Sequence, residues 1–236
     1  MVIFLIWSNA QKGCYTAIRS GLICHNSESL RFLTLTSVPD MARSITDCFK
    51  VLVNRIERMT PFKFVNLGLI SEKKLSYYFP DIGLNDFLKF DYLYVLTSEG
   101  ANGVLHILYF GSYINEKWLK DSWENITGGA RQLIIENVNQ GDKNIIELSR
   151  YIVNQNKIFG YVAGQSAYVR HSYSKNWIYR GWRNDFLKLK RVYLEKYENR
   201  FKFKILDESF WNAWYNWLVS MYVYNSSIDD WLNDNL

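Results

Sequence analysis

Three side chains have types and surroundings that could support phosphodiester chemistry: Glu99, His106 and Tyr151. Glu99 and His106 lie in the stretch TSEGANGVLHILYFG, residues 97–111, which indicates two strand ends joined by a glycine-containing loop. If Glu99 faces Val104 across this hairpin, Glu99 and His106 are diagonal neighbours on one face and can share an ion. One carboxylate and one imidazole suit Mg²⁺ or Mn²⁺, with water and phosphate oxygens completing the coordination shell.

The same histidine has a simpler interpretation. A single histidine on an apolar strand is more often a hydrogen-bonded core residue than a metal ligand. A slip of one residue in the hairpin register would also place Glu99 and His106 on opposite faces of the sheet. The hairpin alone therefore leaves both the metal site and the core histidine open.

Tyr151 belongs to a predicted helix over 144–155, where Gln155 follows it by one turn on the same side. A tyrosine hydroxyl can attack a phosphodiester if a metal ion polarises and orients the phosphate. Gln155 can donate a hydrogen bond to a phosphate oxygen of bound DNA. The alternative is that Tyr151 is an aromatic residue at the edge of a helix that only packs its ring.

The periodicity of the sequence predicts the elements that would hold these residues. Alternating apolar and polar residues indicate strands over 31–39, 62–70, 92–100, 103–111 and 131–138. Apolar residues at helical spacing indicate helices over 40–59, with Asp40 as N-cap, and over 116–128, 144–155 and 209–225. This order predicts an α+β fold, in which a central antiparallel sheet with the 92–111 hairpin at its centre carries helices on one face.

A basic, aromatic segment follows between Tyr168 and Lys204. It contains eleven Lys or Arg and three acids, a net charge of +8, whereas the whole chain carries +5. Ten aromatic residues are interleaved with these charges. Because bases stack on aromatic rings and cations follow phosphates, this composition suits single-stranded nucleic acid. The candidate DNA-binding residues of this segment are Arg170, Lys175, Trp177, Arg180 and Arg183. The alternative is a solvated helix face over an aromatic core.

Composition limits the remaining possibilities. The chain has 236 residues, 48% of them hydrophobic, which is enough for one large domain with a packed core. Its apolar N-terminal run is far shorter than the roughly 20 residues of a membrane span, so we expect no membrane partner and a cytoplasmic location. The three cysteines fit no disulfide framework, and Cys14, Cys24 and His25 match no common zinc spacing.

The order of motifs resembles one known family. The strand FLTLT comes first, the histidine strand VLHILYFG second, and the helical tyrosine in SRYIVNQ last. The segments TSEG, KWLKDSWENITG and RHSYSKNWIYRGW add to the likeness. This arrangement resembles the HUH endonucleases, the rolling-circle replication initiators (Rep proteins) of plasmids and viruses, and most of all their archaeal members. The likeness covers roughly residues 31–183.

The resemblance implies a five-stranded antiparallel sheet of the ferredoxin-like or RRM-like kind, a Mg²⁺ or Mn²⁺ site on Glu99 and His106, and Tyr151 as nucleophile. It implies nicking of single-stranded origin DNA, with a 5′-phosphotyrosine adduct and a free 3′ hydroxyl, and host replication proteins as further partners. The chain departs from the family at Leu108, where the second histidine of the pair would fall.

We therefore expect three parts: an N-terminal arm over 1–30, an HUH-like nuclease domain over 31–183, and a helical, aromatic-rich extension over 184–236. The main functional expectation is a metal-dependent tyrosine DNA endonuclease that initiates replication. The first alternative is a DNA-binding relative that has lost the ion site, which Leu108 favours. The second alternative is a structural or interaction protein with an incidental basic face.

Overall fold

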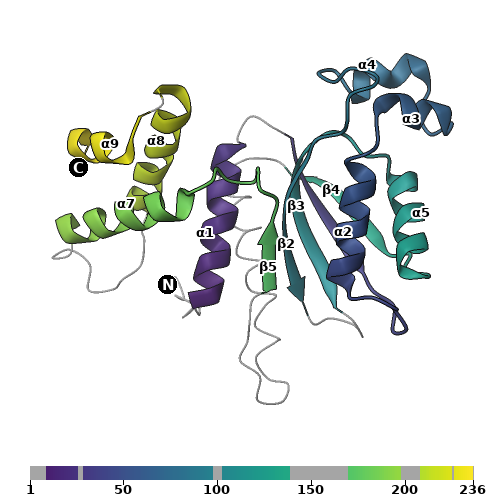
Figure 1. The fold of residues 1–236 in the computed structure, drawn as a ribbon, viewed down its shortest axis with the longest axis horizontal. Coiled ribbons are helices and arrows are strands. Elements are labelled where there is room, and N and C mark those ends of the chain that lie inside the picture. Colours follow the sequence, from purple (N-terminus) through teal and green to yellow (C-terminus); the bar gives the residue numbers. More distant parts are fainter. Residues whose placement is uncertain are drawn as a thin grey trace. The chain divides into compact units, whose positions relative to one another are not determined.

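The computed structural model of the chain describes residues 9–25, 29–97, 103–138, 170–197, 208–224 and 226–235 (Figure 1). The chain divides into two compact units. The first, which we call the sheet unit, consists of Met1–Arg19 and His25–Trp177. The second, the helical unit, consists of Ser20–Cys24 and Ile178–Leu236. Each unit is described by itself.

The sheet unit contains a five-stranded, fully antiparallel sheet in the order β4-β1-β3-β2-β5. Its strands are β1 (Leu30–Thr36), β2 (Phe90–Thr97), β3 (Val104–Gly111), β4 (Leu133–Val138) and β5 (Arg170–Tyr173). The predicted α+β class and antiparallel sheet are confirmed. The β2–β3 hairpin supplies the middle strand of the sheet, as predicted.

Two helices, α2 (Ile45–Ile56) and α5 (Glu116–Thr127), lie on the same side of this sheet (Figure 1). We call the side beneath them the helix-covered face. Its strand residues Leu33, Leu35, Leu105 and Ile107 are completely buried in one core together with residues of both helices. The Phe49 ring of α2 contacts two tyrosine rings of β2 edge-on. The alternation in the sequence predicts this face because successive strand residues point to opposite sides.

Local capping explains why α5 was predicted well. The Asn115 side chain accepts a hydrogen bond from the Trp118 backbone N–H at 3.1 Å. Gly128 ends the helix with a left-handed backbone (φ 78°), a conformation that glycine adopts without strain. The Trp123 indole is buried and donates to the Thr36 carbonyl at 2.9 Å, which joins α5 to β1.

One predicted helix start and one predicted strand are wrong. Helix α2 begins at Ile45 rather than after Asp40, because the Ser44 hydroxyl caps it by accepting from the Asp47 N–H at 3.2 Å. The predicted strand over 62–70 is instead the helix α3 (Pro61–Asn66). Thr60 caps α3 and Pro61 occupies its first turn, which is a helix start signal that outweighs the apolar alternation.

Two short helical elements lie between α3 and β2. A short 3₁₀ turn (Glu72–Lys74) leads into the one-turn helix α4 (Leu75–Tyr78). The Phe64 ring of α3 stacks on Phe79, just after α4, with centroids 6.1 Å apart. Helix α1 (Asn9–Cys24) contributes its residues up to Arg19 to the sheet unit and its last residues to the helical unit.

The helical unit consists of the last residues of α1 with α7 (Trp182–Tyr197), α8 (Glu208–Tyr224) and α9 (Ile228–Asn235). Its core is an aromatic cluster: the Phe186 ring of α7 contacts the rings of Phe210 and Trp214 of α8 edge-on. The Trp214 indole donates to the Ser20 hydroxyl at 3.0 Å. The predicted helix over 209–225 is confirmed, and its residues Phe210, Trp214 and Trp217 are buried as its periodicity indicated.

A partly buried polar contact adds to this core. The Tyr179 hydroxyl donates to the Asp185 carboxylate at 2.6 Å and accepts from the Trp217 indole at 3.3 Å. Burial, reinforced by the hydrogen bond to Asp185, raises the pKa of Tyr179 above its ordinary range. Across the described parts of both units, no helix combines the length and the apolar character needed to cross a bilayer.

Candidate functional site

His106 lies on β3, the middle strand, on the face of the sheet that points away from α2 and α5. Its side chain is 5% exposed. Its ring lies parallel to the Phe32 ring with centroids 5.8 Å apart, and its Nδ1 is 3.5 Å from the Thr34 hydroxyl. These contacts are those of a histidine packed against its strand neighbours, so the geometry fits the core interpretation at least as well as the metal one.

The strand register places His106 in a row across four strands. Thr34 of β1 faces His106, His106 faces Val95 of β2, and Val95 faces His171 of β5. We call the side that carries these residues the histidine face. Because neighbouring strands lie about 4.8 Å apart, the Cα atoms of the two histidines are separated by about 10 Å.

His171 was not singled out from the sequence as a site residue. It lies in the four-residue strand Arg170–Tyr173, which is too short to show an alternating pattern. The only sequence signal was its place in the segment RHSYSKNWIYRGW, which entered the family resemblance as a whole. Only pairing with β2 reveals that this histidine shares a face with His106.

The predicted hairpin register is wrong. Thr97, rather than Glu99, faces Val104, so the loop is two residues longer on the β2 side than assumed. Gly103 explains the closure: its φ is 88°, and a Cβ there would lie 2.7 Å from the Thr97 carbonyl oxygen. Glu99 falls outside the described residues, as do the predicted nucleophile Tyr151 and Gln155.

The described ranges contain no group of three or more His, Cys, Asp or Glu side chains that could hold a metal ion. Leu108, at the position of the second family histidine, is completely buried. Cys14 is also buried, and burial raises the pKa of its thiol to about 12, which disfavours the thiolate that a metal would need. His25 stacks on Phe110 with ring centroids 4.7 Å apart.

Trp177, predicted to stack on DNA bases, is a core residue. Its side chain is completely buried, its indole donates to the Ala17 carbonyl at 3.0 Å, and its ring contacts Phe110 and His25. Neither face of the ring is open to a nucleobase. The prediction that Trp177 stacks on DNA bases is therefore wrong, because burying this large aromatic ring in the core stabilises the fold.

Three of the predicted cations of the same segment are exposed. Lys175, Arg180 and Arg183 all point to solvent. Arg170 opens β5, where it faces Leu96 of β2. Further along α7, Arg191 is exposed too, while its apolar neighbour Leu189 is completely buried. The segment therefore has the amphipathic arrangement of a solvated basic surface over an aromatic core.

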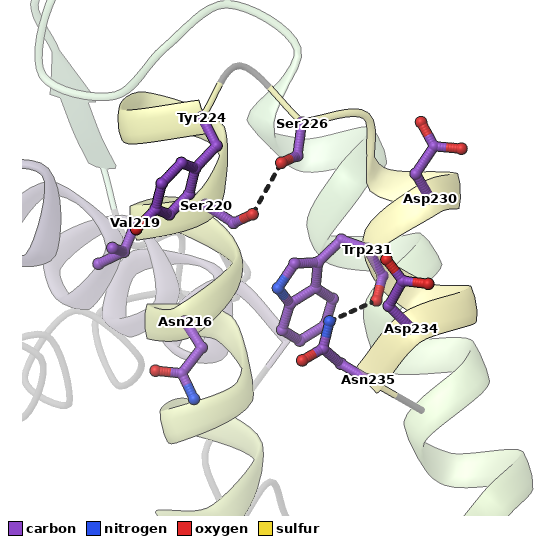
Figure 2. A pocket seen from close by; sticks show the side chains of 9 residues that line it. All are labelled: Asn216, Val219, Ser220, Tyr224, Ser226, Asp230, Trp231, Asp234 and Asn235. Atoms are coloured by element: carbon purple, nitrogen blue, oxygen red, sulfur yellow. Dashed lines mark hydrogen bonds between the residues drawn. The ribbon is translucent and has the colours of Figure 1, made fainter.

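The helical unit also carries a pocket of about 310 Å³ between α8 and α9 (Figure 2). Figure 2 shows Tyr224 and Asn216 on α8 and Trp231, Asp230 and Asp234 on α9 around it. Within it the Ser220 hydroxyl donates to the Ser226 hydroxyl at 2.8 Å. None of the sequence-predicted site residues lines this pocket.

The described structure thus offers a histidine face on the sheet, exposed cations along α7, and an acidic pocket between α8 and α9. Comparisons with known protein families, curated proteins and solved structures found no match to this chain.

Proposed function

We propose that the protein binds single-stranded DNA, in the manner of a replication initiator of the HUH type that has lost its ion site. The observation that carries the proposal is the division of α7 into two sides. Trp182, Phe186, Leu189 and Tyr193 recur at helical spacing and are buried. Arg183 and Arg191 lie exposed on the same helix, and Arg180 is exposed just before it.

These three guanidinium groups are available to phosphates. None of them forms a salt bridge with another residue that the structure describes. The Arg183 guanidinium lies 5.7 Å from the centroid of the Trp182 ring, which restricts its side chain without neutralising its charge. By contrast, Lys188 of the same helix is paired with Asp229. Free cations on a rigid helix attract the DNA backbone with little entropic cost.

The sheet supports the family resemblance that the sequence motifs suggest. The HUH resemblance implies a five-stranded antiparallel sheet, and the chain has one with His106 on its middle strand. Burial of His106 and the leucine at position 108 favour binding over nicking. The proposal is therefore the DNA-binding alternative rather than the endonuclease.

Nicking is the second candidate, and the histidine face favours it. His171 brings a second imidazole to the side of the sheet that carries His106. With Glu99 and a DNA phosphate, these groups could hold Mg²⁺ or Mn²⁺. The Tyr151 hydroxyl would lose its proton as its oxygen attacks the phosphorus, the bond from phosphorus to the 3′ oxygen would break, and that oxygen would take up a proton and leave as the 3′ hydroxyl.

Fluorescence anisotropy with a labelled oligothymidylate tests the binding proposal. We expect tighter binding to the single strand than to duplex, and log affinity falling with log salt at a slope of about −0.7 per phosphate contact. Arg180→Ala with Arg183→Ala should weaken binding and flatten this slope by about 1.4. Lys188→Ala is the matched control, because this cation already has a carboxylate partner. A slope unchanged in the double variant would contradict the proposal.

A denaturing gel tests nicking. The protein is incubated with single-stranded origin DNA and Mn²⁺, and a covalent protein–DNA adduct is sought. An adduct that disappears in Tyr151→Phe, with DNA affinity retained, would establish the endonuclease. An adduct that persists in Tyr151→Phe would transfer the role to another nucleophile, and no adduct with the parent protein supports the binding proposal.

A further inference from the structure

The sheet unit displays three aromatic side chains outside its core. Phe62 is 45% exposed, Tyr77 79% and Phe87 66%. They belong to α3, to α4 and to the turn that leads into β2. We call these three residues the aromatic patch. Large aromatic side chains are costly to expose, so a group of three within one short stretch of structure needs an explanation.

The backbone around the patch is held in place. The Phe62 N–H donates to the Leu84 carbonyl at 3.0 Å, and the Leu88 N–H donates to the Met59 carbonyl at 3.0 Å. These bonds place the start of α3 beside the turn that carries Phe87. Phe64, two residues after Phe62, is completely buried and contacts the Trp118 ring of α5 edge-on. The part of the patch formed by Phe62 and Phe87 therefore stands on backbone that is anchored to the core of the sheet unit.

Positive charge accompanies the patch. Residues 58–89 carry five Lys or Arg and three acids, a net charge of +2. Lys73 and Lys74 are exposed, precede Tyr77 by about one helical turn, and form no ion pair with another described residue. One of the acids, Asp86, accepts a hydrogen bond from the Gly83 N–H at 3.0 Å, so its carboxylate stabilises the turn over residues 83–86. Open aromatic rings beside unpaired ammonium groups are the two components of a single-strand binding surface.

We propose that the aromatic patch stacks bases of single-stranded DNA while Lys73 and Lys74 contact its phosphates. This inference rests on the proposed function and assigns its base contacts to a different place. Both tryptophans of the basic segment are used in cores: Trp177 is completely buried and Trp182 is 6% exposed. The patch offers rings for stacking and ammonium groups for phosphates within the sheet unit itself, whereas cations alone give only backbone attraction.

Binding of labelled oligothymidylate by single-site variants tests the inference. Tyr77→Ala and Phe87→Ala should each weaken binding roughly fivefold or more, because a stacked base contributes about 1–3 kcal/mol. The salt slope should stay the same in both, since no cation is removed. Lys73→Ala with Lys74→Ala should instead flatten the slope by about 1.4.

Two conservative variants are the matched controls. Tyr77→Phe keeps the ring and should bind like the parent protein. Leu67→Ala removes an exposed side chain that is apolar but not aromatic, 57% exposed, and should also leave binding unchanged. All these side chains lie at the surface, so the circular dichroism melting curves should coincide with that of the parent.

The outcomes separate the two proposals. If the parent protein binds and the α7 variants lose affinity while Tyr77→Ala and Phe87→Ala do not, the inference is wrong and the proposed function stands. If the parent protein does not bind, the proposed function itself is wrong. If Phe87→Ala changes the sedimentation coefficient from that of a dimer to that of a monomer and leaves DNA affinity unchanged, the patch is a contact between copies and the inference is overturned.

Discussion

The two faces of the sheet in the sheet unit use the same strands for different purposes. On the helix-covered face, Leu105 and Ile107 of β3 pack into an apolar core with α2 and α5. On the histidine face, the neighbouring residue His106 lies against Phe32 and within hydrogen-bond distance of Thr34. A strand that alternates in this way can serve stability on one side while it places polar groups on the other.

The difference indicates where changes should be costly. Burial of branched apolar side chains stabilises the fold most when every neighbour is apolar, because no polar group has to be satisfied. A face that mixes imidazole, hydroxyl and apolar groups gives less stabilisation for the same area and more scope for substitution. The predictions below test this contrast from its largest consequence to its smallest.

The largest effect should come from Ile107→Ala. This side chain is completely buried on the helix-covered face, so its removal should lower the free energy of unfolding by about 2–5 kcal/mol. The adjacent residue on the histidine face is the control: His106→Leu keeps most of the volume and should cost less than about 1.5 kcal/mol. Urea denaturation of both variants measures the difference. Equal losses would show that the histidine face is as important to stability as the other face.

Alkaline pH should weaken the helix-covered face through Tyr109. Burial raises the pKa of its phenol to about 12, against an ordinary value near 10. The folded state therefore favours the neutral form, and the stabilisation present below about pH 10 is lost as the pH rises towards 12. At about 1.4 kcal/mol per pKa unit the loss is roughly 2–3 kcal/mol.

Urea denaturation at a series of pH values checks this prediction. The series runs from roughly pH 9 to 12, the range over which tyrosine titrates. Tyr109→Phe keeps the ring and removes the ionisable group, so its stability should fall less steeply over the same range. The prediction fails if the parent and the variant show the same dependence on pH.

A smaller effect is expected at the start of α2, the helix that covers this face. Ser44→Ala removes the hydroxyl that accepts from the Asp47 N–H and should cost about 1 kcal/mol. Asp40→Ala, at the residue that the sequence suggested as the cap, should cost close to nothing. Thermal melting of the two variants distinguishes the caps, and a larger effect at Asp40 would mean that the helix starts earlier in solution.

The sequence predicted those elements whose signals are local. The alternation in 31–36 and the helical spacing of apolar residues in α5 involve residues close together in the chain. The prediction failed where two local signals competed: the apolar run over 62–70 suggested a strand, but Thr60 and Pro61 start a helix. The hairpin register failed because loop length, which depends on Gly103, is not encoded in the alternation.

The candidate site was less accessible to sequence reasoning because it depends on distant contacts. The composition of the basic segment predicted its charge, but it did not show whether each aromatic side chain faces the core or the solvent. Trp177 is buried because its indole reaches Ala17, 160 residues earlier in the chain. The two histidines share a face only because β5 pairs with β2. Such pairings follow from the assembled sheet rather than from any local pattern.

The smallest effect should come from Thr34→Val on the histidine face. The Thr34 hydroxyl lies 3.5 Å from His106 Nδ1, which is long for a hydrogen bond, and valine has nearly the same shape as threonine. We therefore expect the free energy of unfolding to change by less than about 1 kcal/mol. Nitrogen NMR of the His106 ring is the more sensitive measurement, because losing the hydroxyl should alter the balance between its two tautomers. If Thr34→Val instead costs as much as Ile107→Ala, this contact is a strong one and the contrast between the two faces is wrong.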